Sequence, residues 1–418
     1  MLKKIESLIS NAYIYAVFTK IVTLLLGVSY SILYSRYLGT ELKGYSSVIN
    51  SSISLLTIIG CMGIYQAYPF YKKNKVDNLE EEYFSVTQTI FVFTVVVSII
   101  AILLFNKSIT LVITFILFPF SVLIQEYNYY SLIENPNRRN TWAIYENIAE
   151  MIVLTFFILF IHKSIEGLLL LVIGKFAIAY ICSIYIIHKP VYKSKLNLIT
   201  TFRYIKYGFI PMLTVLCMTV NYSIDIIMLQ GKVHMKDIGI YSLGINLAQY
   251  VWLIPDTLKD ILLSRLTSGK KEDEVAMLIR INLTIVLMLI VSIIIIGKPV
   301  ISLIYGKEFS ESYQITVIVL CGIFSMVYYK VIYSYNVVCG RKMINLFYLL
   351  IAALLNVIGN YILIPKFGIY GAASVSVCSY SICGLLFLTH FLKNTNIKFN
   401  EVTFLTRKDI KKLYAVLK

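Results

Sequence analysis

Residues 275–297 read VAMLIRINLTIVLMLIVSIIIIG, and Arg280 is the one charged residue in that stretch. An α-helix of this length rises about 35 Å, which is enough to cross the roughly 30 Å hydrocarbon core of a bilayer. The whole chain has 418 residues, 58% of them hydrophobic, and a mean hydropathy of +0.78. One aqueous core would not hide that much apolar surface. We therefore expect lipid to be the solvent of this protein.

Apolar runs of this kind recur about twelve times, separated by short basic loops. The runs are continuous and do not alternate with polar residues, which predicts helices rather than barrel strands. They lie near residues 12–34, 45–67, 84–104, 109–133, 142–161, 167–187, 207–229, 238–262, 275–297, 313–338, 344–364 and 370–392. The remaining connectors are too short for a separate catalytic domain. The sequence therefore predicts an all-α polytopic membrane protein.

The two halves of the chain resemble each other. The triplet NRR at residues 137–139 precedes the fifth run and the triplet GRK at residues 340–342 precedes the eleventh, a displacement of about 200 residues. Six helices followed by six in the same orientation form a parallel repeat, and two such halves typically enclose a central cavity. We expect about twelve transmembrane helices in two six-helix bundles around such a cavity. The expected parts are bundles at residues 1–187 and 207–392, a basic connector at 188–206 and a basic tail at 393–418.

The basic residues indicate the orientation. One set of alternate loops, together with both ends of the chain, carries 24 of the 38 lysines and arginines, whereas the opposite set carries 9. Because positively charged loops stay on the inner side, both termini are expected in the cytoplasm. Much of the net charge of +16 thus serves topology, and no nucleic-acid partner is needed to explain it.

Motifs for enzymatic chemistry are missing from the sequence. The four histidines are scattered without a zinc-binding spacing, and there is no GxxxxGK[ST] phosphate loop. All seven cysteines lie in or at the edge of apolar runs, which is typical of buried thiols and not of a disulfide framework. We expect no catalytic residues, no metal site and no enzyme.

Three stretches carry a family resemblance. Residues 356–373, NVIGNYILIPKFGIYGAA, are the first, and residues 221–241, which begin NYSID and end DIGIY, are the second. RYLG at residues 36–39 is the third. Together they resemble the O-antigen repeat-unit flippases of polysaccharide biosynthesis, which belong to the superfamily of multidrug, oligosaccharidyl-lipid and polysaccharide exporters.

The resemblance implies a function. Such a flippase moves undecaprenyl-pyrophosphate-linked oligosaccharide from the cytoplasmic to the outer leaflet of the bacterial inner membrane by alternating access. It serves O-antigen, lipopolysaccharide or capsule biosynthesis. Membrane lipids, a polysaccharide polymerase and a chain-length regulator are then the expected partners. No cofactor is expected beyond a proton or sodium ion for coupling.

Basic residues within the runs are candidate ligands for the pyrophosphate, because charges are costly in hydrocarbon and usually face a cavity or a partner. Lys20 lies about eight residues into the first run, roughly 12 Å deep, and Lys175 lies at similar depth in the sixth. Lys330 lies nearer the cytoplasmic end of its run, where snorkelling is an equal alternative. Arg36 lies at the outer mouth. Salt-bridged structural lysines are the alternative for Lys20 and Lys175.

Acids and prolines within the runs suggest coupling and gating. Asp225, deep in the seventh run, is either a proton or sodium site or a counter-charge for a lysine. Glu146 and Glu150 share a helix face, and Arg138 or Arg139 is their expected partner. Kinks are expected at three prolines, which are Pro119, Pro211 and Pro255. These prolines are either hinges for gating or the ordinary kinks that are common in membrane helices.

Three alternatives to a repeat-unit flippase remain open. A multidrug or cation antiporter of the same superfamily would place acids, not lysines, at the centre of its cavity. A membrane-embedded polysaccharide polymerase would need a sizeable outer loop, whereas the longest outer connectors here, near residues 231–237 and 298–312, are short. A transporter for another lipid-linked precursor, such as that of peptidoglycan, typically has more helices.

Overall fold

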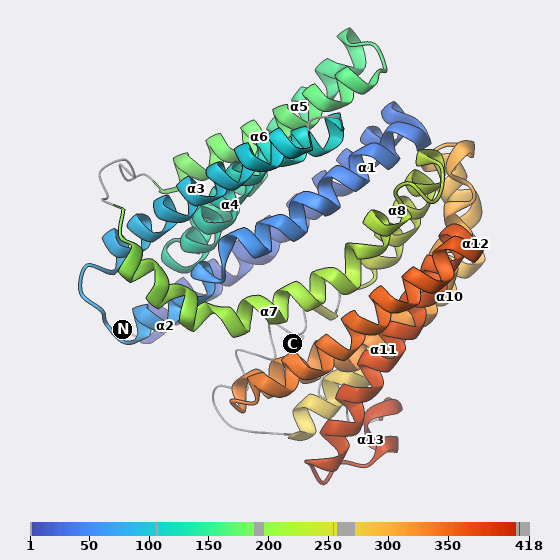
Figure 1. Cartoon of the computed structure of the whole chain (residues 1–418). Coiled ribbons are helices and arrows are strands. Elements are labelled where there is room, and N and C mark those ends of the chain that lie inside the picture. The colour runs from blue at the N-terminus through green and yellow to red at the C-terminus, as the bar shows by residue number, and fades with distance from the viewer. Residues whose placement is uncertain are drawn as a thin grey trace. The chain divides into compact units, whose positions relative to one another are not determined.

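The computed structural model describes residues 2–105, 108–187, 196–253, 255–256, 272–406 and 409, with side chains from Tyr15 on except residue 17. These residues are almost entirely helical, and no β-strand longer than a single bridge occurs among them. They divide into two compact units, Met1–Leu216 and Cys217–Lys418. Figure 1 colours the first unit from blue to green and the second from green to red. The prediction of an all-α protein is confirmed.

The first unit contains α1 to α6 and the beginning of α7. Their bounds are α1 Leu2–Cys61, α2 Ile64–Lys73, α3 Leu79–Leu104, α4 Ile109–Glu134, α5 Pro136–Phe160, α6 Ile165–Ile187 and α7 Leu198–Leu229. The second unit contains the rest of α7 and the later helices. Their bounds are α8 Met235–Tyr250, α10 Glu272–Ile304, the short 3₁₀ helix η2 Lys307–Phe309, α11 Ser312–Val338, α12 Lys342–Lys393 and α13 Phe399–Thr403.

Helix α1 consists of two helical spans that meet at Gly39 and form a hairpin. Gly39 has φ 72° and ψ −179°, a conformation that is essentially restricted to glycine. The Tyr34 hydroxyl lies 2.5 Å from Ser46 Oγ, although residues twelve apart in a straight helix would be about 18 Å apart. The chain therefore folds back at Gly39. RYLG, one of the family-like stretches, is the sequence that ends at this reversal.

Helix α12 folds back in the same way at Gly368, which has φ 53°. Asn356 Nδ2 donates to Ser379 Oγ at 3.2 Å across 23 residues, so the parts of α12 on either side of Gly368 lie against each other. These two hairpins account for four of the predicted spans.

Nine helices of the described residues are long and apolar enough to cross a membrane. Two of the nine, α1 and α12, each contain two spans. Helix α8 covers the beginning of the predicted eighth span. Residues 254 and 257–262 of that span, along with 188–195 of the predicted connector, fall outside the described residues. The described residues thus contain eleven of the predicted spans and part of the eighth, divided between two helical units.

In the first unit, α1 packs on α4 and α5, and α4 also packs on α3 and α6. Its inner side chains include many tyrosines; Tyr68, Tyr83 and Tyr130 form a contiguous ring cluster between α2, α3 and α4. In the second unit, α11 is central and packs on α8, α10 and α12. Hydroxyls of α11 hold α8, because Ser312 donates to the Ile240 carbonyl at 2.8 Å and Thr316 to the Gly244 carbonyl at 3.1 Å.

The α11–α12 contact depends on Gly384. A Cβ at this position would lie 2.0 Å from the Ser325 carbonyl oxygen, a backbone atom that can move only if the helices separate. Gly384→Ala is therefore expected to lower the melting temperature by well over 5 °C or to abolish folded yield, as overpacking costs about 1–3 kcal/mol or more. Thermal unfolding in detergent measures it. Gly27→Ala is the matched control, since its Cβ would meet only Asn147 Oδ1 at 4.0 Å.

The tail after α12 docks on the beginning of α10. The Arg280 guanidinium donates to both carboxylate oxygens of Asp409, at 2.7 and 2.8 Å, and to the Glu401 carbonyl. Burial alone would raise the pKa of Asp409, but hydrogen bonds from Arg280 and Thr406 outweigh it and lower the pKa to about 2. Val402 is fully buried in this contact. The predicted tail is thus anchored as far as Asp409.

Because the folded pKa of Asp409 lies below its ordinary value of 3.8, the docking energy is present above pH 4 and is lost as the pH falls toward 2. Asp409→Asn is expected to weaken docking by about 2 kcal/mol at neutral pH, the value of a charged hydrogen bond. Limited proteolysis of the tail at pH 7 measures this. Cleavage as slow as in the native protein would contradict it, and Asp273→Asn, an exposed acid at the beginning of α10, is the control.

Candidate functional site

The polar site of the first unit begins with an ion pair between α5 and α6. Helix α5 places Glu146 and Glu150 one turn apart, and α6 places Lys175 opposite them. Lys175 Nζ lies 3.7 Å from Glu150 Oε2, which is too long for a good hydrogen bond and marks a loose ion pair. Glu150 pairs with Lys175 and not with the expected Arg138 or Arg139, because α6 packs beside α5 and brings a lysine closer. Arg139 does lie close enough to Glu146 to interact with it electrostatically.

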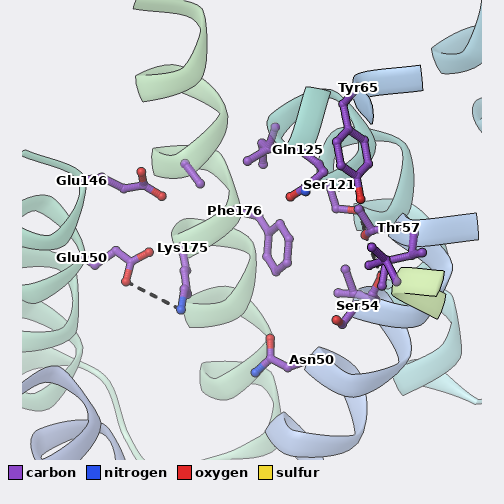
Figure 2. A pocket seen from close by; sticks show the side chains of 15 residues that line it. Asn50, Ser54, Thr57, Tyr65, Ser121, Gln125, Glu146, Glu150, Lys175 and Phe176 are labelled. Carbon is purple, nitrogen blue, oxygen red and sulfur yellow. Dashed lines mark hydrogen bonds and ion pairs between the residues drawn. The ribbon is translucent and has the colours of Figure 1, made fainter. Parts of the chain in front are cut away.

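These residues line a cavity of about 400 Å³ in the first unit, together with residues of α1 and α4. Figure 2 shows Lys175 pointing toward Glu150 on one side of the cavity. On the opposite side, the figure shows a row of side chains with hydroxyl and amide groups. The labelled polar residues opposite the ion pair are Asn50, Ser54, Thr57, Tyr65, Ser121 and Gln125. Uncharged donors and acceptors of this kind suit the hydroxyls of sugars, while the mixed charges at the other wall suit a charged group.

A second cavity of about 110 Å³ lies next to the first. Tyr30, Ser31, Tyr34 and Lys43 of α1 line it. Asn50, Leu171, Val172 and Lys175 complete the lining, so Asn50 and Lys175 face both cavities. The first cavity lies along α1 toward α2, and the second lies toward the Gly39 reversal. The two cavities therefore follow each other along the bundle.

The four predicted basic ligands are in different surroundings. Lys175 lines both cavities, as just described. Lys20 and Arg36 have exposed side chains on α1 and are not among the residues that line either cavity. Lys330 belongs to the second unit. Within the first unit the structure therefore brings one of the predicted ligands, Lys175, into a cavity.

Lys330 contacts an acidic and an aromatic side chain of the second unit. Its Nζ lies 2.8 and 2.9 Å from the carboxylate oxygens of Asp256 and 4.8 Å from the centre of the Trp252 ring. The lysine side chain is buried, so it does not snorkel. Asp256 follows Pro255, one of the predicted hinges, while Pro119 and Pro211 lie inside α4 and α7. A hinge role for these prolines stays a prediction.

Asp225 is fully buried in the second unit, between α7, α8 and α12. Its carboxylate accepts hydrogen bonds from the Tyr241 hydroxyl, from the Ser376 hydroxyl at 3.2 Å and from the Ile226 backbone N–H at 2.8 Å. One turn earlier on α7, both amide atoms of buried Asn221 find no hydrogen-bond partner in the described part of the chain. No lysine lies within ion-pair distance of Asp225 among those residues. Its surroundings are hydroxyls and amides.

The sequence prediction missed Lys43. The hydropathy pattern counts it among the basic residues of outer loops, yet the structure places it in the second half of α1 with only 8% of its surface exposed. The signal is in the sequence. Lys43 begins a polar stripe with spacings of four, three, four and three residues, which places the whole stripe on one helix face; its other members are Ser47, Asn50, Ser54 and Thr57.

Comparison with known proteins places the fold. No protein-family model and no curated protein sequence matches this chain. Among solved structures, the lipid II flippase MurJ in an inward closed conformation has a TM-score of 0.74 and 18% identity, over 97% of this chain and 92% of that one. An inward-facing multidrug resistance transporter of the MATE family, in the MOP superfamily, has a TM-score of 0.70 and 11% identity, over 90% and 97%. A mutant of the Vibrio cholerae MATE transporter VcmN has a TM-score of 0.61 and 14% identity, over 95% and 99%. At these identities the likeness concerns the fold: this chain is folded like a lipid-linked precursor flippase and like multidrug transporters.

Proposed function

We propose that this protein is a flippase of the MOP superfamily for undecaprenyl-pyrophosphate-linked oligosaccharide repeat units. It moves them by alternating access from the cytoplasmic to the outer leaflet of the bacterial inner membrane, in O-antigen or capsule biosynthesis. Both termini are cytoplasmic. A polysaccharide polymerase and a chain-length regulator act beside it.

One observation carries the proposal, which is the composition of the 400 Å³ cavity. Its walls combine six uncharged hydrogen-bonding side chains with the ammonium of Lys175 and the carboxylates of Glu146 and Glu150. Uncharged polar groups can replace the water around sugar hydroxyls, and a lysine can replace part of the hydration of a diphosphate. The acyl chain can remain in lipid. The resemblance to O-antigen flippases and the fold shared with MurJ agree with this assignment.

The proposal extends to the other predicted residues. Lys20, Arg36 and Lys330 are further ligands for the diphosphate during the cycle, and a proton or sodium ion binds at Asp225 to drive it. Pro119, Pro211 and Pro255 are the hinges. These roles rest on charge, depth and the superfamily resemblance.

A second candidate is export of cationic compounds by the same fold. The observation in its favour is that Glu146 and Glu150 line the same cavity as Lys175, so the described ionisable groups of the larger cavity include two acids and one base. The neighbouring 110 Å³ cavity adds Lys43 and no carboxylate. The two cavities together thus have two acids and two lysines, but both lysines line the 110 Å³ cavity, which no described carboxylate lines. That cavity favours an anionic group, and we therefore place the exporter second.

Transport in proteoliposomes separates the two. Undecaprenyl-pyrophosphoryl-N-acetylglucosamine is placed in the inner leaflet, and a soluble galactosyltransferase labels only molecules that reach the outer one. Efflux of ethidium from the same vesicles is measured in parallel. We expect labelling well above protein-free vesicles and no ethidium efflux. Ethidium efflux without labelling would overturn the flippase and establish the exporter.

A further inference from the structure

Lys43 is the most unusual charge in the first unit. It follows the Gly39 reversal on α1, is more than nine-tenths buried and lines the 110 Å³ cavity. In the described part of the chain no carboxylate pairs with it, and its ammonium lies 5.1 Å from the centre of the Tyr34 ring. A cation–π contact contributes about 2 kcal/mol when desolvated, less than the several kcal/mol that burial of an ion costs. The positive charge of Lys43 in this cavity is therefore not neutralised by any described carboxylate.

Lys175 faces the same cavity from α6. Its ammonium lies 5.2 Å from the centre of the Tyr30 ring, and Tyr30 and Tyr34 stack one turn apart with centroids 5.3 Å apart. Each of the two stacked tyrosine rings thus makes a cation–π contact with one lysine, and both lysines line the 110 Å³ cavity. Two like charges close together in a low dielectric repel each other, and an anion between them removes that repulsion.

The cavity has the size and donors for one oxyanion. A volume of 110 Å³ has room for several water molecules, and therefore for a small oxyanion. Tyr30, Ser31 and Asn50, whose side chains have hydroxyl and amide groups, line it together with the two lysines. Asn50 Nδ2 donates to Ser46 Oγ at 3.2 Å, and Ser46 contacts the Tyr34 hydroxyl, so these groups are held in place by one another.

We propose that Lys43 and Lys175 form a binding site for a phosphate-type oxyanion, and that this site holds the diphosphate of the substrate. The second statement rests on the proposed function; the first does not. Since Lys175 and Asn50 also face the 400 Å³ cavity, a diphosphate bound between the lysines leaves its first sugar at the hydroxyl-lined wall. When the anion binds, Lys175 gives up its long ion pair with Glu150 and contacts the anion instead. Lys43 loses no ion pair, because no described carboxylate pairs with it.

Binding of inorganic pyrophosphate to the purified full-length protein in nanodiscs tests the site. Titration calorimetry is expected to show one site in the native protein and an affinity at least tenfold lower in Lys43→Met, which keeps length and removes charge. Lys43→Arg is expected to retain most of the affinity. Lys163→Met, at an exposed lysine before α6, is the matched control and binds like the native protein. Equal binding by Lys43→Met, or none by the native protein, overturns the site.

Two further measurements separate this site from the proposed function. Loss of a buried charge that has no carboxylate partner should leave the melting temperature of Lys43→Met unchanged or raise it, so weaker binding would not reflect unfolding. Undecaprenyl pyrophosphate is then titrated beside inorganic pyrophosphate. A parallel loss of both identifies the lipid headgroup as ligand, and loss of the inorganic probe alone overturns the headgroup assignment. Normal flipping by Lys43→Met would overturn the site's role in transport while leaving the flippase in place.

Discussion

Lys175→Ala is expected to slow the transfer of lipid-linked N-acetylglucosamine by about 10- to 100-fold without reducing the amount of folded protein. One charged hydrogen bond to the diphosphate is worth about 1.5–3 kcal/mol, and every 1.4 kcal/mol is a factor of ten. Lys175 is the predicted ligand that lines both cavities, so its loss removes a contact from either position of the substrate. Its side chain is 42% exposed and its ion pair with Glu150 is long, so the fold should tolerate the change.

The measurement is the initial rate of galactosyltransferase labelling, normalised to protein incorporated into vesicles. Lys163→Ala, an exposed lysine that precedes the same helix, serves as the control and should transport normally. Glu150→Gln gives an independent comparison. In a flippase it frees Lys175 and preserves or increases the rate, whereas in a cation exporter it would remove a substrate ligand. Full activity of Lys175→Ala would exclude the lysine from the transport path.

The positions of the helices follow from hydropathy because membrane spans are long and nearly free of charge. The stretches that end at Gly39 and surround Gly368 fall between predicted spans, and the structure shows that each is a sharp reversal within a hairpin. The predicted eighth span differs from the structure in one respect, since α8 ends at Tyr250, twelve residues before the predicted end. Glycines between the apolar runs determine where the chain reverses, so the sequence alone is enough to place the two hairpins.

The ionisable residues are harder to predict because their environment depends on neighbouring helices. Depth is the criterion for Lys20 and Lys175, but depth does not say which face of a helix looks inward, and one side chain is exposed while the other lines two cavities. Lys330 finds Asp256, 74 residues away in sequence. Lys43 lies just before an apolar run, so hydropathy alone predicts a loop there. The polar stripe that continues from it corrects that prediction.

Asp225→Asn is expected to abolish gradient-driven accumulation of substrate while passive equilibration continues. If one ion is coupled to each cycle, a tenfold ion gradient contributes about 1.4 kcal/mol and sustains at most a tenfold accumulation. A carboxylate held by two hydroxyls and a backbone N–H in a fully buried site can bind a proton or sodium ion, and an amide cannot do so with the same charge. The absence of a nearby lysine within the described residues favours this role over that of a counter-charge.

The experiment imposes proton and sodium gradients separately on vesicles that contain the native protein, Asp225→Asn or Asp273→Asn. The last is an exposed acid at the beginning of α10 in the same unit and should respond like the native protein. Tyr241 and Ser376 donate to one carboxylate oxygen of Asp225, and the Ile226 N–H donates to the other. In Asp225→Asn an NH₂ group replaces one of these oxygens and faces a donor, so we expect a loss of about 1–3 kcal/mol of stability, which thermal unfolding checks. A folded Asp225→Asn protein that still accumulates substrate in response to both gradients would show that the energy enters elsewhere. A response lost for one ion and kept for the other would identify the coupling ion, because the site would then discriminate between a bare proton and a coordinated sodium.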